Sequence, residues 1–235
     1  MERLAQTALD AATGCGANYA DVRVIDRRHE IIQTKNETVA GLDIGSSYGI
    51  GIRVLCDGGW GFAATQEVTN AGISEAARRA VATAKASAMC LERPITLAPE
   101  PVHEASWISP YQVDPFTISL EQKSGLLQDA AGIILSVKGI TLAQGLLTFV
   151  REDKYFTSTE GSKIHQVFIR SSCGIEANAT NENDRQRRSW PNSGGGQYEL
   201  AGWEMVEKWN LKGNAQRIAE EAVALLSAPQ CENKT

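Results

Sequence analysis

Two histidine–glutamate pairs are the clearest candidates for catalysis or metal binding in this sequence of 235 residues. A helix that carries two histidines one turn apart, with a glutamate beside the first, can hold a metal ion and activate water. The pairs His29-Glu30 and His103-Glu104 each lack a second histidine four or five residues later. His29 lies in a strand pattern and His103 in a proline-rich stretch. We therefore predict that His29, His103 and His165 are surface residues, with their convergence around a metal as the alternative.

The cysteines and serines also lack a catalytic pattern. The cysteines are widely spaced and form no CxxC pair, which argues against a structural zinc knuckle. We predict free thiols in a reducing compartment, and a catalytic cysteine remains the alternative. Ser171-Ser172, next to Cys173, lacks the elbow glycines of a serine hydrolase. The cysteines are Cys15, Cys56, Cys90, Cys173 and Cys231.

Three glycine-containing stretches resemble fragments of phosphate loops. They are Gly49-x-Gly51, Asp57-Gly58-Gly59 and the run from Ser193 to Gly196. None has the context of a dinucleotide fingerprint or a P-loop, so we predict that they are turns. Because no constellation is complete, we assign no catalytic, cofactor-binding or metal-ligating residue to this chain.

Helical periodicity marks several elements that must position any site. The clearest helix is predicted over 73–84, where a stripe of mostly alanine should approach a sheet closely. Shorter helices are predicted over 4–12 and over 215–226. Ser119 and Gln122 have capping-box spacing, which predicts another helix start.

Strand patterns fill most of the remaining sequence, and short turns join them. A Gly-Ser-Ser turn is predicted at 45–47, and Asp57-Gly58-Gly59 predicts a hairpin. Sequential strands with short connections favour antiparallel pairing. The predicted strands are 22–32, 39–44, 48–56, 60–64, 133–150, 154–158 and 163–179.

These elements predict an α+β fold of antiparallel sheets packed with a few helices, in two domains. Five prolines between residues 94 and 115 indicate a linker or an extended crossing segment. We place the boundary near residue 100, which gives domains of 1–100 and 101–235.

Composition excludes several classes of protein. The net charge of -5 disfavours nonspecific binding of nucleic acid. The basic cluster of Arg185, Arg187 and Arg188 is predicted to be a solvated loop or strand edge. No apolar run approaches the roughly 20 residues that span a bilayer, and no secretory signal is visible at the start. We predict a cytoplasmic protein with neither nucleic-acid nor membrane partners.

Several segments together resemble the TldD/PmbA family. Gly49 to Thr65 looks like the signature strand pair of the family, and Tyr19 to Arg23 fits its first strand. Lys154 to Gln166 resembles the "SxEG" hairpin, and Ala219 to Pro229 resembles the helix before the catalytic domain. The Gly-Phe-Ala after the hairpin is more similar to the TldD branch than to the PmbA branch. By this resemblance the chain is identified as the amino-terminal and middle domains of a TldD-type member.

The resemblance implies a cytosolic zinc metalloprotease, also labelled a modulator of DNA gyrase, that cleaves small or unfolded peptides. Family members are about twice this length, and their carboxy-terminal half carries an HExxxH helix and a later cysteine as zinc ligands. Zinc is therefore expected for the full-length protein. We expect the zinc helix to lie beyond Thr235, so that this chain itself holds no cofactor. A homodimer or heterodimer with a TldD/PmbA-type subunit is also implied.

Two functions stay open on these grounds. The first is the amino-terminal part of a TldD-like metallopeptidase, in which this segment serves assembly and substrate enclosure. The second is a non-catalytic binding or assembly module, either a PmbA/TldE-like pseudo-protease fragment or a split-gene subunit. A DNA-associated regulator is disfavoured by the acidic charge and by the lack of a recognition helix.

Overall fold

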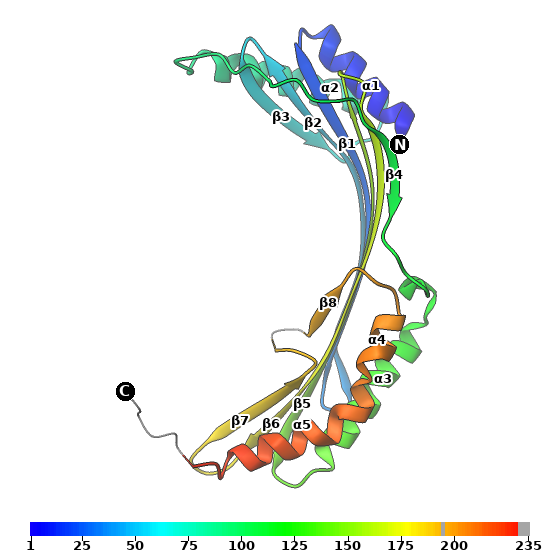
Figure 1. The fold of residues 1–235 in the computed structure, drawn as a ribbon, viewed down its shortest axis with the longest axis vertical. Helices are drawn as coiled ribbons and strands as arrows, with labels where there is room; N and C mark the ends of the chain where they lie inside the picture. The colour runs from blue at the N-terminus through cyan, green and yellow to red at the C-terminus, as the bar shows by residue number, and fades with distance from the viewer. Residues whose placement is uncertain (194–195, 230–235) are drawn as a thin grey trace. The chain divides into compact units, whose positions relative to one another are not determined.

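The computed structural model describes residues 1–193 and 196–229, which fold as helices packed on an eight-stranded sheet (Figure 1). This confirms the predicted α+β fold. The helices are α1 (Glu2–Gly14), α2 (Asn70–Ala88), the 3-10 turn η1 (Pro115–Thr117), α3 (Leu120–Leu135), α4 (Glu204–Trp209) and α5 (Leu211–Leu225). The strands are β1 (Tyr19–Lys35), β2 (Thr38–Cys56), β3 (Gly59–Thr65), β4 (Glu104–Ile108), β5 (Ile140–Ser158), β6 (Lys163–Thr180), β7 (Arg185–Trp190) and β8 (Gln197–Glu199).

The strands lie in the order β3-β2-β1-β5-β6-β4, and β7 and β8 also pair with β6. The pair β2–β3 is antiparallel, as the sequence predicts, and β7 and β8 also pair with β6 in antiparallel orientation. The exception is β4, which is parallel to β6. It lies between Pro101 and Pro110 and contains no proline itself, so its N–H groups remain available for pairing.

Two compact units alternate along the chain. Strands β1, β2, β5 and β6 contribute residues to both units. Each of these strands has 17 to 19 residues, and at about 3.3 Å per residue such a strand is about 60 Å long. The predicted domains 1–100 and 101–235 stay a prediction, and the compact units are interleaved because each long strand enters both. Unit 1 is Met1–Arg28, Ser46–Ile108 and Glu152–Phe168, and unit 2 is His29–Gly45, Ser109–Arg151 and Ile169–Thr235.

In unit 1, α1 and α2 pack against the sheet through small side chains. Thr69 caps α2, because its hydroxyl accepts a hydrogen bond from the Gly72 amide at 3.1 Å. The inward stripe of α2 is mainly alanine, and β3 meets it with bare backbone at Gly59 and Gly61. A Cβ on Gly61 would lie 2.0 Å from the carbonyl oxygen of Ala80. The close approach predicted for this helix is therefore confirmed.

In unit 2, α3, α4 and α5 cover one face of the sheet (Figure 1). Leu127 of α3, Phe149 of β5 and Ile218 of α5 are buried in a common core. The predicted capping box is confirmed: the Ser119 hydroxyl accepts from the Gln122 amide at 3.1 Å, and the Gln122 side chain accepts from the Ser119 amide at 3.4 Å.

The turn predicted at 45–47 is wrong, because β2 continues through these residues without a break. Gly45 faces His29 across the strand pair, and a Cβ on Gly45 would lie 2.6 Å from Cε1 of the histidine ring. This glycine makes room for a neighbouring side chain inside a strand, which is the other common use of glycine there.

Some element boundaries also differ from the prediction. The strand predicted from residue 133 is helical at its start, since α3 runs to Leu135 and β5 begins at Ile140. Strands β4, β7 and β8 and helix α4 were not predicted. The predicted turn over 193–196 includes residues 194–195, which lie outside the described residues, as does the tail 230–235. Among the described helices, none combines the length and apolar character needed to cross a membrane.

Candidate functional site

The three histidines each have their own local partners. In unit 2, His29 Nε2 lies 3.3 Å from Asp43 Oδ1. In unit 1, His165 Nε2 lies 2.7 Å from Asp153 Oδ1, and the His103 amide donates to the Ser162 hydroxyl at 3.0 Å. Across residues 1–193 and 196–229, no three histidine, cysteine, aspartate or glutamate side chains gather as metal ligands would. The described residues therefore do not fit a zinc site.

The two buried thiols are poor nucleophiles. Burial raises the pKa of Cys173 to about 12, and its Sγ lies 3.8 Å from Sδ of Met205. Burial also raises the pKa of Cys56, whose Sγ donates to the Gly16 carbonyl oxygen at 3.1 Å. Because the thiolate is the reactive form, neither side chain is suited to attack a substrate. The prediction of free thiols is confirmed for Cys15, Cys56, Cys90 and Cys173, and Cys231 lies outside the described residues.

The glycine stretches that resembled phosphate loops have backbone roles. Asp57 and Gly58 adopt positive φ in the β2–β3 hairpin, so the predicted turn is confirmed there. Gly49 and Gly51 lie inside β2, which confirms the strand predicted over 48–56 and shows that the turn predicted for these two glycines is wrong. Neither stretch opens a helix that could hold a phosphate.

The motif Thr157 to Gly161 ends β5 and forms a hairpin pinned to its neighbours. The Thr159 hydroxyl accepts from the Ala20 amide at 3.1 Å, and the Thr159 amide donates to the Ala20 carbonyl oxygen at 2.9 Å. Gly161 has φ +99, which only glycine adopts easily. These bonds fasten the hairpin to the start of β1, so its polar residues have a structural use.

The basic cluster is divided between two sides of β7. Arg187 Nη1 lies 3.9 Å from Glu176 Oε2 on β6, whereas Arg188 Nε lies 3.8 Å from Glu221 Oε2 on α5. Arg185 donates to the Asn178 side chain at 2.9 Å. Because successive residues of a strand face opposite sides, these arginines do not form one phosphate-binding surface.

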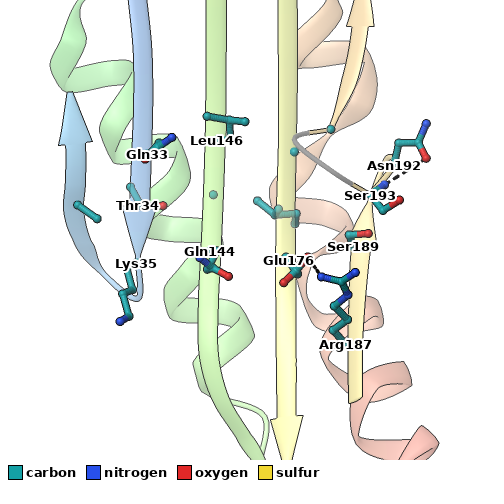
Figure 2. A pocket seen from close by; sticks show the side chains of 15 residues that line it. Gln33, Thr34, Lys35, Gln144, Leu146, Glu176, Arg187, Ser189, Asn192 and Ser193 are labelled. Carbon is teal, nitrogen blue, oxygen red and sulfur yellow. Dashed lines mark hydrogen bonds and ion pairs between the residues drawn. The ribbon is translucent and has the colours of Figure 1, made fainter. Parts of the chain in front are cut away.

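A polar hollow lies on the sheet face of unit 2 that faces away from the helices (Figure 2). Buried residues such as Ile32 and Ala143 point to the helices, so the alternating residues Gln33 and Gln144 point the other way. The hollow has a volume of about 480 Å³ and is lined by residues of β1, β2, β5, β6 and β7. Its polar side chains are Gln33, Lys35, Gln144, Glu176, Arg187, Ser189, Asn192 and Ser193.

The polar hollow offers donors and acceptors without a catalytic pair. Glu176 accepts from the Asn178 side chain at 3.0 Å and lies near Arg187, as the dashed line in Figure 2 marks. The carboxamides of Gln33 and Gln144 each carry both a donor and an acceptor, the combination that a peptide main chain also presents. No histidine lines the hollow beside Ser189 or Ser193. This arrangement suits the binding of an extended chain rather than bond cleavage.

Thr34, on the opposite side of β1 from Gln33, gives a test of the packing beneath the hollow. Its hydroxyl is buried without a hydrogen-bond partner among the described atoms. We expect Thr34→Val to raise the free energy of unfolding by about 1 kcal/mol, because it removes an unpaired buried polar group at nearly constant volume. Urea denaturation measures the change.

The matched control is Thr141→Val on β5. The Thr141 hydroxyl lies 3.0 Å from that of Thr180 and donates to the Asn178 carbonyl oxygen at 3.3 Å, so this variant should be less stable than the wild type. A loss of stability in Thr34→Val equal to that in the control would mean that the Thr34 hydroxyl is paired in solution.

Models of known protein domains match two segments of the chain. Residues 20–84 match the model described as PmbA/TldA metallopeptidase domain 1. Residues 113–227 match the model described as the PmbA/TldA metallopeptidase central domain. No curated protein matches the chain.

Solved structures share the fold at low sequence identity. A candidate modulator of DNA gyrase from Thermotoga maritima aligns with a TM-score of 0.73 and 17% identity over 98% of this chain and 50% of its own. One from Bacteroides thetaiotaomicron aligns with a TM-score of 0.76 and 15% identity over 94% and 49%. TldE from Thermococcus kodakarensis aligns with a TM-score of 0.63 and 13% identity over 95% and 47%. The chain thus spans about half the length of each of these structures.

Proposed function

The chain belongs to the PmbA/TldD metallopeptidase family, and we propose that it is the amino-terminal and central part of a TldD-like zinc metallopeptidase that acts on small or unfolded peptides in the cytoplasm. The observation that carries the proposal is the match of both metallopeptidase domain models, in order, to residues 20–84 and 113–227. In this proposal the chain serves assembly with a TldD/PmbA-type subunit and encloses the peptide.

Zinc and the catalytic residues belong, in this proposal, to polypeptide other than these 235 residues. When bound, zinc would activate a water molecule for attack on a peptide carbonyl. In this proposal, the role of the 235-residue chain is to hold the substrate. The carboxamides, hydroxyls and charged groups of the polar hollow support this role, since an extended peptide needs partners for its N–H and C=O groups.

The proposal predicts that the purified chain binds peptide without cleaving it. A fluorescein-labelled unstructured decapeptide should bind with an affinity that Gln33→Ala/Gln144→Ala weakens by about tenfold, because each lost hydrogen bond in a partly buried site contributes about 0.5–1.5 kcal/mol. Fluorescence anisotropy measures the affinity. Chromatography of the same mixture should show the peptide intact, and cleavage should follow only when a metal-binding carboxy-terminal half from the same family is added.

The matched control is Gln216→Ala on α5, where the glutamine is exposed and its side chain donates to Glu220 at 2.8 Å. This variant should bind peptide like the wild type. Stoichiometric zinc in the chain alone, or peptide cleavage by it alone, would contradict the proposal. Complete absence of peptide binding would contradict the holding role.

The second candidate is a non-catalytic assembly module of the TldE kind, and the shared fold with TldE favours it. The two candidates separate in the reconstitution. A metallopeptidase part should support cleavage with a metal-binding half supplied, whereas an assembly module should bind that half without making it active.

A further inference from the structure

A buried carboxylate in unit 1 holds two arginines at the surface. Asp21 of β1 is fully buried, and Arg53 of β2 donates to its Oδ2 through Nε at 2.7 Å and Nη2 at 2.6 Å. Arg23 of β1 pairs with Oδ1 of the same carboxylate. The Tyr19 hydroxyl donates to Oδ2 at 3.2 Å. One buried anion therefore fixes two cations side by side.

Aromatic rings complete the support of these arginines. The Arg53 guanidinium lies 4.7 Å from the ring centre of Trp60, and the Arg23 guanidinium lies 4.9 Å from that of Phe156. The two arginine side chains nevertheless stay 45% and 42% exposed. Because a carboxylate and a ring hold each guanidinium, little side-chain entropy remains to be lost when a ligand binds.

The strand surface beside Arg53 has two glycines, Gly49 and Gly51, and a ring from β3 lies over one of them. Gly49, Gly51 and Arg53 alternate with the buried residues of β2 and so share the face that points away from α1 and α2. The Phe62 ring lies over Gly51, 3.2 Å from the position of a Cβ there, and Phe62 is 60% exposed. An extended chain could lie on this surface with one end at the arginines.

Asp21 and the two arginines that pair with it together carry one net positive charge. Asp21 neutralises one of the two arginines, and the carboxylate of Glu160 acts on Tyr19 from the nearby hairpin. Burial lowers the pKa of Arg53, but the hydrogen bond and charge of Asp21 outweigh it and raise the pKa above its ordinary value. The Arg53 guanidinium therefore stays charged, and both arginines keep N–H groups that Asp21 does not use.

We propose that Arg23 and Arg53 form a binding site for the carboxylate of a peptide, with the terminal carboxylate as the preferred group. This rests on the proposed function, since it assigns a feature of the peptides that the chain holds. A guanidinium edge matches the planar carboxylate with two parallel hydrogen bonds. A single excess charge fits a monoanion better than the dianion of a phosphate, which would lie close to Asp21.

Isothermal titration of the 235-residue chain tests the site with three versions of one acetylated pentapeptide. The versions carry a free carboxyl end, an amidated end, or an amidated end with one internal aspartate. We expect the free acid to bind about tenfold more tightly than the amide, in keeping with one charge-assisted pair. Equal binding of the aspartate version and the free acid would overturn the preference for the terminal carboxylate.

Variants separate this site from general charge effects. Arg53→Lys keeps the positive charge but loses the paired N–H groups of the guanidinium, so it should remove most of the tenfold difference in affinity between the free acid and the amide. Arg78→Lys on α2 should leave this difference unchanged. Glu160→Gln should strengthen binding of the free acid. Thermal unfolding checks that each variant is folded, and Arg23→Lys replaces Arg53→Lys if the latter is not.

The outcomes also separate this inference from the proposed function. If acid and amide bind equally and only the polar-hollow variants weaken binding, the carboxylate site is wrong and the holding role stands. If inorganic phosphate binds more tightly than the free acid, the assignment to carboxylates is wrong. If no peptide binds at all, both proposals fall.

Discussion

Replacing Lys123 with methionine is expected to lower the free energy of unfolding by about 3–5 kcal/mol, the usual cost of breaking a buried ion pair. Lys123 of α3 is fully buried, and its Nζ lies 2.5 Å from Oε2 of Glu30 on β1. The same nitrogen lies 4.8 Å from the ring centre of Phe149 and 5.9 Å from that of Phe116. Methionine fills similar space but removes the ammonium group that pairs with the buried Glu30 carboxylate.

Urea denaturation followed by tryptophan fluorescence measures this loss. Trp203 reports on the same core, since its ring centre lies 5.9 Å from that of Phe149. The double variant Lys123→Met/Glu30→Met should regain most of the lost stability, because two apolar side chains replace both charges. A double variant as unstable as the single one would show that the loss comes from packing and not from the broken ion pair.

Lys212→Met is the matched control for Lys123→Met. Lys212 of α5 pairs with Asp129 of α3 at 2.8 Å, but both side chains are about half exposed. Exposed pairs contribute about 0–1 kcal/mol, so this variant should change stability little. A loss in the control as large as in Lys123→Met would contradict the account from burial.

Local patterns in the sequence predict the elements of this fold well. The alanine stripe of α2, the Ser119 capping box and the Asp57-Gly58 hairpin depend on residues within a few positions of one another, and the structure confirms all three. In these cases the residues that form the element also contain the signal for it, so the local sequence is enough to predict the element.

Features that depend on distant partners could not be predicted. Gly45 looked like part of a turn because nothing local reveals the His29 ring across the strand pair. The polar hollow joins Gln33, Gln144 and Glu176 from three strands, and only the strand order brings them together. Their one local signal is that each polar residue alternates with buried ones along its strand.

Replacing Gly61 with alanine is expected to lower the free energy of unfolding by about 3 kcal/mol, the upper part of the usual range for overpacking. A Cβ at this position of β3 would lie 2.0 Å from the Ala80 carbonyl oxygen and 2.5 Å from the Ala84 amide nitrogen of α2. Both atoms belong to helix backbone, so no side-chain rotation can relieve the clash and α2 must move away from the sheet. That movement weakens the contacts of the whole alanine stripe.

Gly125→Ala on α3 is the matched control, because a Cβ there meets nothing within 4 Å. Alanine inside a helix is favoured over glycine by about 0.5–1 kcal/mol, so this variant should be slightly more stable than the wild type. In urea denaturation, we expect the free energy of unfolding to fall in Gly61→Ala and to rise in Gly125→Ala, although both variants replace glycine with alanine. The two positions differ mainly in the space around the new methyl group. A Gly61→Ala variant as stable as the wild type would therefore mean that α2 does not contact the bare backbone of β3. The alanine stripe of α2 would then need another explanation.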